Sequence, residues 1–210
     1  MYKRQIETVT QDGLFASLDI HNNTGRNPNY SVLTCLEPKF LNLAKMFAGK
    51  TVLYFEDTMG AFSGTMSQYC PALTVEAGLP GEEEGVQNSL DLAETMMKLD
   101  EVPDAPLASD DLKIMTIQAT MKVPEECSVG FMDESEEADI KFQPGFDRYN
   151  FAEFPEGDVF AELANANARL LILDQDKNDV ADRFFDFSDG KARAKPVSYT
   201  HLRAHETRPY

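Results

Sequence analysis

Asp19 and His21 stand two residues apart at the end of an apolar run, and their types and spacing suit metal chemistry. In a β-strand, residues i and i+2 face the same side, so the two side chains are expected to project together. An imidazole in that place can bind a metal, and the neighbouring carboxylate can orient it. The following residues, Asn22, Asn23 and Thr24, can hydrogen-bond a substrate. Two interpretations stay open: a metal ligand beside a binding loop, or a structural histidine satisfied by its neighbours.

Glu76 closes a second apolar run, at residues 72–76. An unpaired buried carboxylate is costly, so something must compensate its charge. Ligands of open α/β sheets gather at the carboxyl ends of the strands, where both His21 and Glu76 are expected. The glutamate is either a catalytic group or a capping or salt-bridged carboxylate at the sheet edge.

Two other segments fail as functional motifs. Residues 174–179 begin like a calcium-binding EF-hand loop, but Asp179 stands where glycine is needed and Phe185 where a bidentate glutamate is needed. We expect an acidic turn there. Ser63 lies one place too late within residues 60–64 for a nucleophile elbow. A serine hydrolase is therefore disfavoured.

Strand and helix patterns alternate over the first half of the chain. Apolar runs predict strands at residues 14–20, 30–36, 51–55 and 72–76, and helical spacing predicts helices at residues 39–47 and from residue 82 to about residue 97. We expect the second helix to pack into the core through Val86, Leu90, Ala93 and Met97. Such alternation predicts an α/β layer arrangement.

The pattern changes near residue 101. Pro103 and Pro106 lie among acidic residues, and the strand signals beyond them, at residues 112–123 and 168–173, have no long helices between them. We expect an α/β domain over residues 6–100 and a small β-rich domain over residues 101–196.

The two ends of the chain differ from the rest. Residues 197–210 carry two arginines and two histidines but one carboxylate, and both this segment and residues 1–5 look like translated adapter sequence. A frayed natural tail is the alternative. We leave both segments out of fold reasoning and expect a chain truncated at both ends.

Composition narrows the classes of partner. The formal charge of −17 repels nucleic-acid phosphates, so we expect no nucleic-acid partner. No apolar stretch reaches the roughly 20 residues of a membrane span, and no secretory leader opens the chain. Three cysteines without a CxxC pair disfavour a disulfide framework and a thiolate zinc site. We expect a cytoplasmic protein with no membrane partner; the oligomeric state stays open.

Three segments resemble one enzyme family. Residues 19–30 (DIHNNTGRNPNY) and 71–81 (PALTVEAGLPG) resemble motifs of the succinylglutamate desuccinylase/aspartoacylase family, a branch of the zinc carboxypeptidase-like superfamily. Residues 146–163 (FDRYNFAEFPEGDVFAEL) are similar to the start of the family's C-terminal β domain. The resemblance spans about residues 6–196. It implies a partial, mixed-sheet catalytic domain followed by a small β-rich domain.

The resemblance also implies roles for particular residues. His21 matches one of three ligands of a single catalytic zinc ion, with Asp19 behind it, and Glu76 matches the general base and acid. In the family, zinc polarises the carbonyl and activates a water molecule. Glu76 would take a proton from that water and pass it to the leaving amine.

The chain departs from the family pattern in two places. No H-x-x-E motif, which supplies the other two zinc ligands, occurs in it, and the family has that motif upstream of residue 19. Met66 stands where the family has a substrate-binding arginine. Arg26, with Asn22, Asn23 and Thr24 beside it, is the nearest alternative for binding a substrate carboxylate, since its planar fork suits one; an exposed loop arginine is the other interpretation.

The resemblance implies a zinc-dependent amidohydrolase that cleaves the amide bond of an N-acyl amino acid, a small-molecule substrate. One alternative is a carboxypeptidase-like enzyme acting on peptides. Another is an acidic domain without activity. We expect the fragment itself to be inactive, because one histidine cannot supply a three-ligand zinc site.

Overall fold

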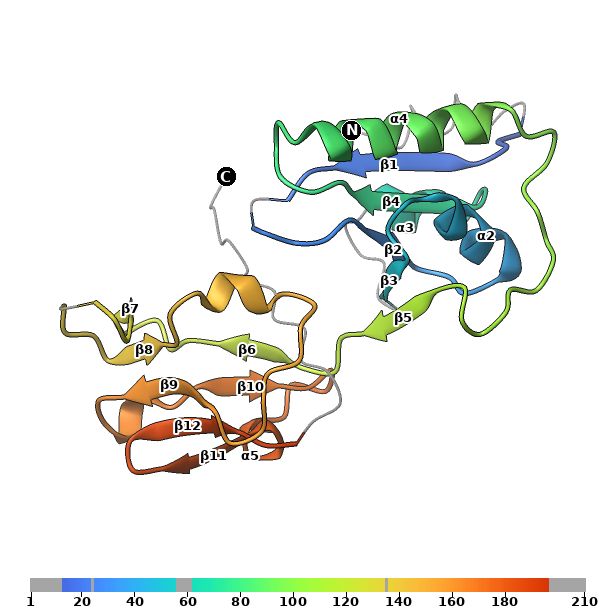
Figure 1. Ribbon diagram of the computed structural model, residues 1–210. Helices are drawn as coiled ribbons and strands as arrows, with labels where there is room; N and C mark the ends of the chain where they lie inside the picture. The colour runs from blue at the N-terminus through green and yellow to red at the C-terminus, as the bar shows by residue number, and fades with distance from the viewer. Residues whose placement is uncertain (1–12, 24, 56–61, 135, 197–210) are drawn as a thin grey trace. The chain divides into compact units, whose positions relative to one another are not determined.

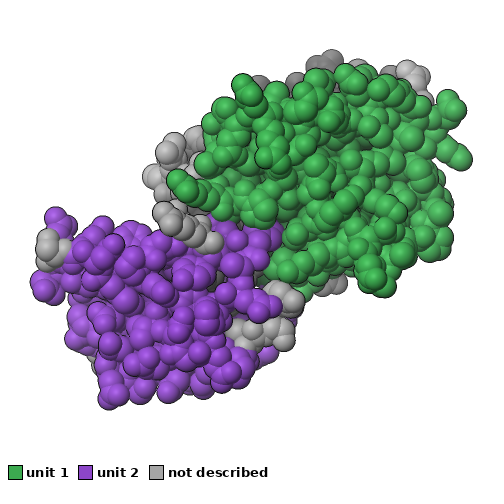
Figure 2. All heavy atoms as spheres, in the orientation of Figure 1, with its two compact units in different colours: residues 1–117 green, residues 118–210 purple. Residues whose placement is uncertain are grey.

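The computed structural model describes residues 13–23, 25–55, 62–134 and 136–196 (Figure 1). The chain divides into two compact units, Met1–Ile117 and Gln118–Tyr210, which Figure 2 shows in separate colours.

A five-stranded mixed sheet forms the centre of the first unit. Its strands are β1 (Ser17–His21), β2 (Tyr30–Leu33), β3 (Thr51–Tyr54), β4 (Ala72–Glu76) and β5 (Lys113–Thr116). They lie in the order β1-β4-β2-β3-β5, as Figure 1 shows from blue β1 to yellow-green β5. The β2–β4 pair is antiparallel and the other three pairs are parallel. The expected α/β class with a mixed sheet is therefore confirmed for this unit.

Three helices accompany this sheet in the described residues: α2 (Pro38–Met46), α3 (Phe62–Met66) and α4 (Glu83–Met97). Proline opens α2, a position where its missing N–H costs nothing, and Phe40, Leu43 and Ala44 face the core. The core also includes Leu33, Phe47, Val52, Leu73 and Val75, each fully buried or nearly so. The apolar strand residues thus pack against the helices. This packing holds in place the strands β1 and β4, which end at His21 and Glu76.

Helix α4 packs through a different face from the one expected. Its buried residues are Gly85, Ser89, Leu92 and Met96. Val86, Leu90 and Met97 are 63%, 49% and 77% exposed, so the expectation that their stripe packs into the core is wrong. Small residues explain the difference. A Cβ at Gly85 would overlap the carbonyl oxygen of Ala77, so only glycine lets the helix approach this closely.

Strand β5 belongs to the first sheet, where Lys113 pairs with Thr51 and Thr116 pairs with Tyr54. The sequence pattern places residues 113–116 in the second part of the chain, beyond a boundary at residue 100. In the structure the chain divides between residues 117 and 118.

The second unit consists mainly of strands. A five-stranded sheet has the order β11-β12-β9-β8-β7, and β6 pairs with β10. The strands are β6 (Thr120–Lys122), β7 (Val129–Phe131), β8 (Ile140–Phe142), β9 (Val159–Leu163), β10 (Leu171–Leu173), β11 (Phe185–Ser188) and β12 (Lys191–Ala194). Between them lie two 3₁₀ turns, η1 (Phe146–Tyr149) and η2 (Ala166–Ala168), and the short helix α5 (Ala181–Phe184).

Aromatic rings make up much of the second core. Phe160 packs against Phe142, Phe146, Phe154 and Phe185 with ring centroids 4.7–5.8 Å apart. Such tilted and edge-to-face pairs are favourable beyond the area that they bury. The unit therefore has a hydrophobic core of its own.

In the part of the chain that the structure describes, none of the helices combines the length and the hydropathy of a membrane span.

Candidate functional site

The parallel ladder between β1 and β4 brings His21 and Glu76 together. The two residues are direct register partners, and both end their strands. The backbone N–H of Ala77 donates to the carbonyl of His21 at 2.8 Å, which fixes this register. Because the pleats of adjacent strands coincide, paired residues point to the same face of the sheet. The two strand ends predicted from sequence thus meet at one edge, on one face.

Asp19 orients the imidazole of His21. Its Oδ2 lies 3.0 Å from His21 Nε2, as the i, i+2 spacing predicts. A carboxylate accepts, so in the neutral imidazole this contact places the proton on Nε2 and the lone pair on Nδ1. The His21 side chain is 54% exposed. This arrangement leaves one nitrogen ligand available at the surface of the sheet edge.

Glu76 is buried, with 8% of its surface exposed, although it ends its strand. On the side away from His21 its register partner is Tyr30, which is 2% exposed. Glu76 therefore lies between His21 and Tyr30 in the register of three neighbouring strands. Sequence reasoning did not find Tyr30, because nothing local to residue 30 shows that β2 pairs antiparallel with β4.

The loop after His21 contains the other predicted site residues. Asn22 and Arg26 are exposed, and Asn23 is buried. Thr24 lies outside the described residues. The backbone N–H of Asn23 donates to the carbonyl of Gly78 at 2.8 Å, so the loop is attached to the turn that follows Glu76.

Gly78 permits that attachment. Its φ of +72° lies in the left-handed region, and a Cβ there would come within 2.6 Å of Glu82 Oε2. The same Glu82 oxygen accepts a hydrogen bond from Leu79 N at 2.9 Å. The turn after the strand of Glu76 thus holds a fixed shape against which the loop of His21 rests.

The described residues do not complete a zinc site. His21 with Asp19 behind it fits one ligand position, because the free Nδ1 is a suitable donor. Within residues 13–196, outside the gaps, no group of three or more His, Cys, Asp or Glu side chains could hold a metal ion. Met66, which stands at the family's arginine position, is buried in the core.

Two acidic segments of the second unit make local hydrogen bonds. Asp139 Oδ2 accepts from the Ser128 hydroxyl at 2.7 Å and from its backbone N–H at 2.9 Å, and these bonds lower the pKa of Asp139. The backbone N–H of Asn178 likewise lowers the pKa of Asp174. Asp174 N also bonds the Asn178 carbonyl, which closes the acidic turn expected there.

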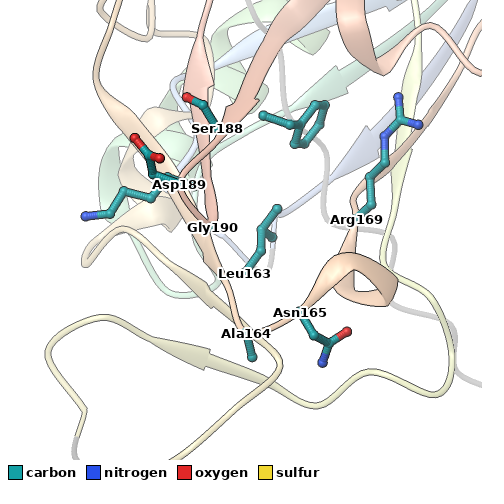
Figure 3. A pocket seen from close by; sticks show the side chains of 9 residues that line it. Leu163, Ala164, Asn165, Arg169, Ser188, Asp189 and Gly190 are labelled. Atoms are coloured by element: carbon teal, nitrogen blue, oxygen red, sulfur yellow. The ribbon is translucent and has the colours of Figure 1, made fainter.

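A separate pocket of about 360 Å³ lies in the second unit, between the end of β9, η2 and the β11–β12 hairpin (Figure 3). The Arg169 guanidinium lies 5.2 Å from the centre of the Phe187 ring and bonds Asp182 at 3.0 Å. Lys191 pairs with Glu162 at 3.1 Å. The cations at this pocket are thus already neutralised, and no sequence motif marks it.

Comparison with known proteins gives likenesses among solved structures. Neither a family model nor a curated protein sequence matches the chain. It is similar to the succinylglutamate desuccinylase of Vibrio parahaemolyticus, at 19% identity and a TM-score of 0.48 over 84% of this chain and 51% of that one. It is also similar to the product-bound ectoine utilization protein EutE (DoeB) of Ruegeria pomeroyi, at 10% identity and a TM-score of 0.48 over 96% and 61%.

A third likeness is to a succinylglutamate desuccinylase/aspartoacylase of Rhodobacter sphaeroides, at 13% identity and a TM-score of 0.44 over 91% of this chain and 54% of that one. Members of the family that the motifs at residues 19–30 and 71–81 resemble are therefore among the structures that the chain is similar to. The chain spans about half the length of the desuccinylase structures that it matches.

Proposed function

We propose that this chain is part of a zinc-dependent enzyme that hydrolyses the amide bond of an N-acyl amino acid in the cytoplasm. The observation that carries the proposal is the register pair of His21 and Glu76, with Asp19 hydrogen-bonded to the imidazole. The resemblance of the two motifs gives these residues their roles.

His21 is proposed as one zinc ligand, and the remaining ligands would come from outside the described residues. Bound zinc supplies Lewis-acid polarisation of a carbonyl group and lowers the pKa of water. Asp19 fixes the tautomer that leaves Nδ1 of His21 free to bind the metal. These two residues thus prepare a single position of the coordination shell.

Glu76 is proposed as the general base and acid. Its carboxylate would take a proton from the water that attacks the amide carbonyl, and would then deliver that proton to the leaving amine nitrogen. Glu76 is 8% exposed, so bulk water has little access to the proposed base.

Substrate binding is proposed for the loop after His21. Arg26 is exposed and can present its guanidinium fork to a substrate carboxylate. Asn22, Asn23 and Thr24 are the neighbouring groups proposed to hydrogen-bond the substrate. The identity of the acyl group is not part of the proposal.

The test uses the complete parent enzyme, obtained by extending the reading frame upstream of this sequence. Glu76→Gln should retain zinc and lose at least about a hundredfold in kcat, since a positioned base typically contributes that much. His21→Ala should lose zinc as well as activity. Glu83→Gln, at an exposed position of α4, is the matched control and should change neither quantity.

Two results would refute the proposal. If Glu76→Gln kept full activity, the proposed base would be wrong. If His21→Ala kept stoichiometric zinc by elemental analysis, the proposed ligand would be wrong.

A further inference from the structure

Three side-chain amide atoms of the loop after His21 are buried and have no hydrogen-bond partner in the described structure. They are Asn23 Nδ2, Asn27 Oδ1 and Asn29 Oδ1. A buried polar atom without a partner costs about 1–3 kcal/mol, and native proteins contain few of them. Three within seven residues, next to the proposed site, therefore indicate a group that satisfies them.

The three asparagines lie in one part of the fold. Asn27 Nδ2 donates to Asn23 Oδ1 at 2.9 Å, so these two amides are adjacent. The backbone of Asn23 bonds the Gly78 carbonyl, and a Cβ added to Gly78 would lie 3.6 Å from Asn29 Oδ1. Asn23 and Asn29 thus both lie at Gly78, two residues beyond Glu76, and Asn27 lies against Asn23.

The types of the three unpartnered atoms define the chemistry of a group that could pair with them. As the amides are placed, one atom is a donor and two are acceptors, so a group that pairs with all three accepts one hydrogen bond and donates two. A carboxylate has no proton to donate and would be repelled by the two carbonyl oxygens. Reversing both amides of the Asn23–Asn27 pair leaves the same one donor and one acceptor. The match is to a small neutral group.

We propose that Asn23, Asn27 and Asn29 form a binding site for a neutral group that accepts one hydrogen bond and donates two, which is the chemistry of a water molecule or of a primary carboxamide. As a part of substrate recognition this site rests on the proposed function, which assigns Asn23 to the substrate. As a binding site it stands on geometry alone, and its test needs no enzyme activity.

The experiment observes the Asn23 side-chain amide by NMR in the ¹⁵N-labelled full chain. If water is the occupant, its signals should show rotating-frame cross-peaks to a long-lived water molecule. If a carboxamide binds, acetamide should shift these signals at concentrations at least tenfold lower than acetate does. Either result supports the site and identifies which of the two groups fills it.

Substitutions separate the site from general effects on the loop. Asn29→Leu removes one acceptor and should abolish the response at Asn23; Asn29→Asp is the second variant if the leucine prevents folding, and its charge should reduce the response at least tenfold. Asn42→Asp is the matched control. Its amide donates to Pro38 O and Ala105 O at 2.8 and 2.9 Å, neither of which belongs to the loop, and the response should stay unchanged.

The inference is overturned if the Asn23 amide shows neither a water cross-peak nor a response to acetamide. It is equally overturned if acetate binds as well as acetamide, or if the response survives in both Asn29 variants. None of these results depends on zinc or on hydrolysis. The asparagine site can therefore be refuted while the proposed function is upheld, and the proposed function can be refuted while the asparagine site is upheld.

Discussion

Replacing Leu92 or Leu90 by alanine makes the same chemical change on opposite faces of α4. Leu92 is 1% exposed and lies in the first core, whereas Leu90 is 49% exposed. Truncating a fully buried leucine removes its transfer free energy and leaves a cavity, which costs about 3–5 kcal/mol. The half-exposed leucine should cost less than about 1 kcal/mol. The change in helix propensity is the same at both positions, so it cancels in the comparison.

The assay is urea unfolding followed by circular dichroism at the helix band. Among the described helices, α2 and α4 are the long ones and both belong to the first unit, so this band reports that unit. The two variants should differ by about 2–5 kcal/mol, so with an m-value of about 2 kcal/mol/M the midpoint of Leu92→Ala should lie roughly 1–2.5 M below that of Leu90→Ala.

An equal or larger loss at Leu90 would refute the reasoning. It would mean that the stripe of Val86, Leu90 and Met97 is covered in solution, as the spacing of apolar residues predicts. A small loss at Leu92 would likewise contradict the packing of α4 described above.

Three further predictions follow from other parts of the structure. Gly85→Ala should lower the free energy of unfolding by about 2–3 kcal/mol, because the new Cβ would overlap the Ala77 carbonyl; this outweighs the helix preference of alanine. Urea unfolding measures the loss. The control Val86→Ala, at an exposed position, should stay within about 0.5 kcal/mol of wild type. Ser128→Ala should raise the pKa of Asp139 in a carbon-detected NMR titration. The hydroxyl and backbone hydrogen bonds from Ser128 lower the pKa of Asp139 in the folded protein. The stability that they add is therefore present above the unfolded pKa of about 3.9 and is lost as the pH falls through the lower folded pKa. An unchanged titration of Asp139 in Ser128→Ala would contradict these hydrogen bonds. The 210-residue chain should bind zinc weakly, because His21 alone cannot supply a three-ligand site, and tight stoichiometric zinc by elemental analysis would contradict this expectation.

Local sequence signals were sufficient to predict several elements. The apolar run bounded by Pro71 and Gly78 predicts a strand at residues 72–76, and β4 has those bounds. The strand ends at His21 and Glu76 were also predictable, since each follows an apolar run. Their shared register was not, because it depends on which strands pair, and pairing partners lie far apart in the chain.

The phase of α4 shows a second limit of sequence patterns. Counting apolar residues selects the stripe of Val86, Leu90 and Met97, but the buried face begins with Gly85 and Ser89. Small residues carry little hydrophobic signal, yet they decide how closely a helix can approach the strand beneath it. Close backbone approach is therefore the information that the apolar pattern lacks.

The candidate site was predictable in its residue types and less so in its surroundings. Asp19, His21 and Glu76 could be selected from the sequence by their residue types and positions. The place of Tyr30 beside Glu76 could not, because it depends on the antiparallel pairing of β2 with β4. The roles of Asn27 and Asn29 depend on burial, which a polar loop sequence does not reveal. An asparagine-rich loop after a strand is compatible with a binding site, but the same residues are equally typical of a turn.

Within the described residues, β1 hydrogen-bonds to β4 and to no other strand. The strand that carries His21 is therefore an edge strand, held by hydrogen bonds on one side only. Among those residues, the backbone groups on its other side have no partner strand. A substitution that weakens the pairing of β1 with β4 would therefore move the imidazole even if it lies far from His21. The backbone of β1, rather than close packing around the half-exposed side chain, determines where the ring lies.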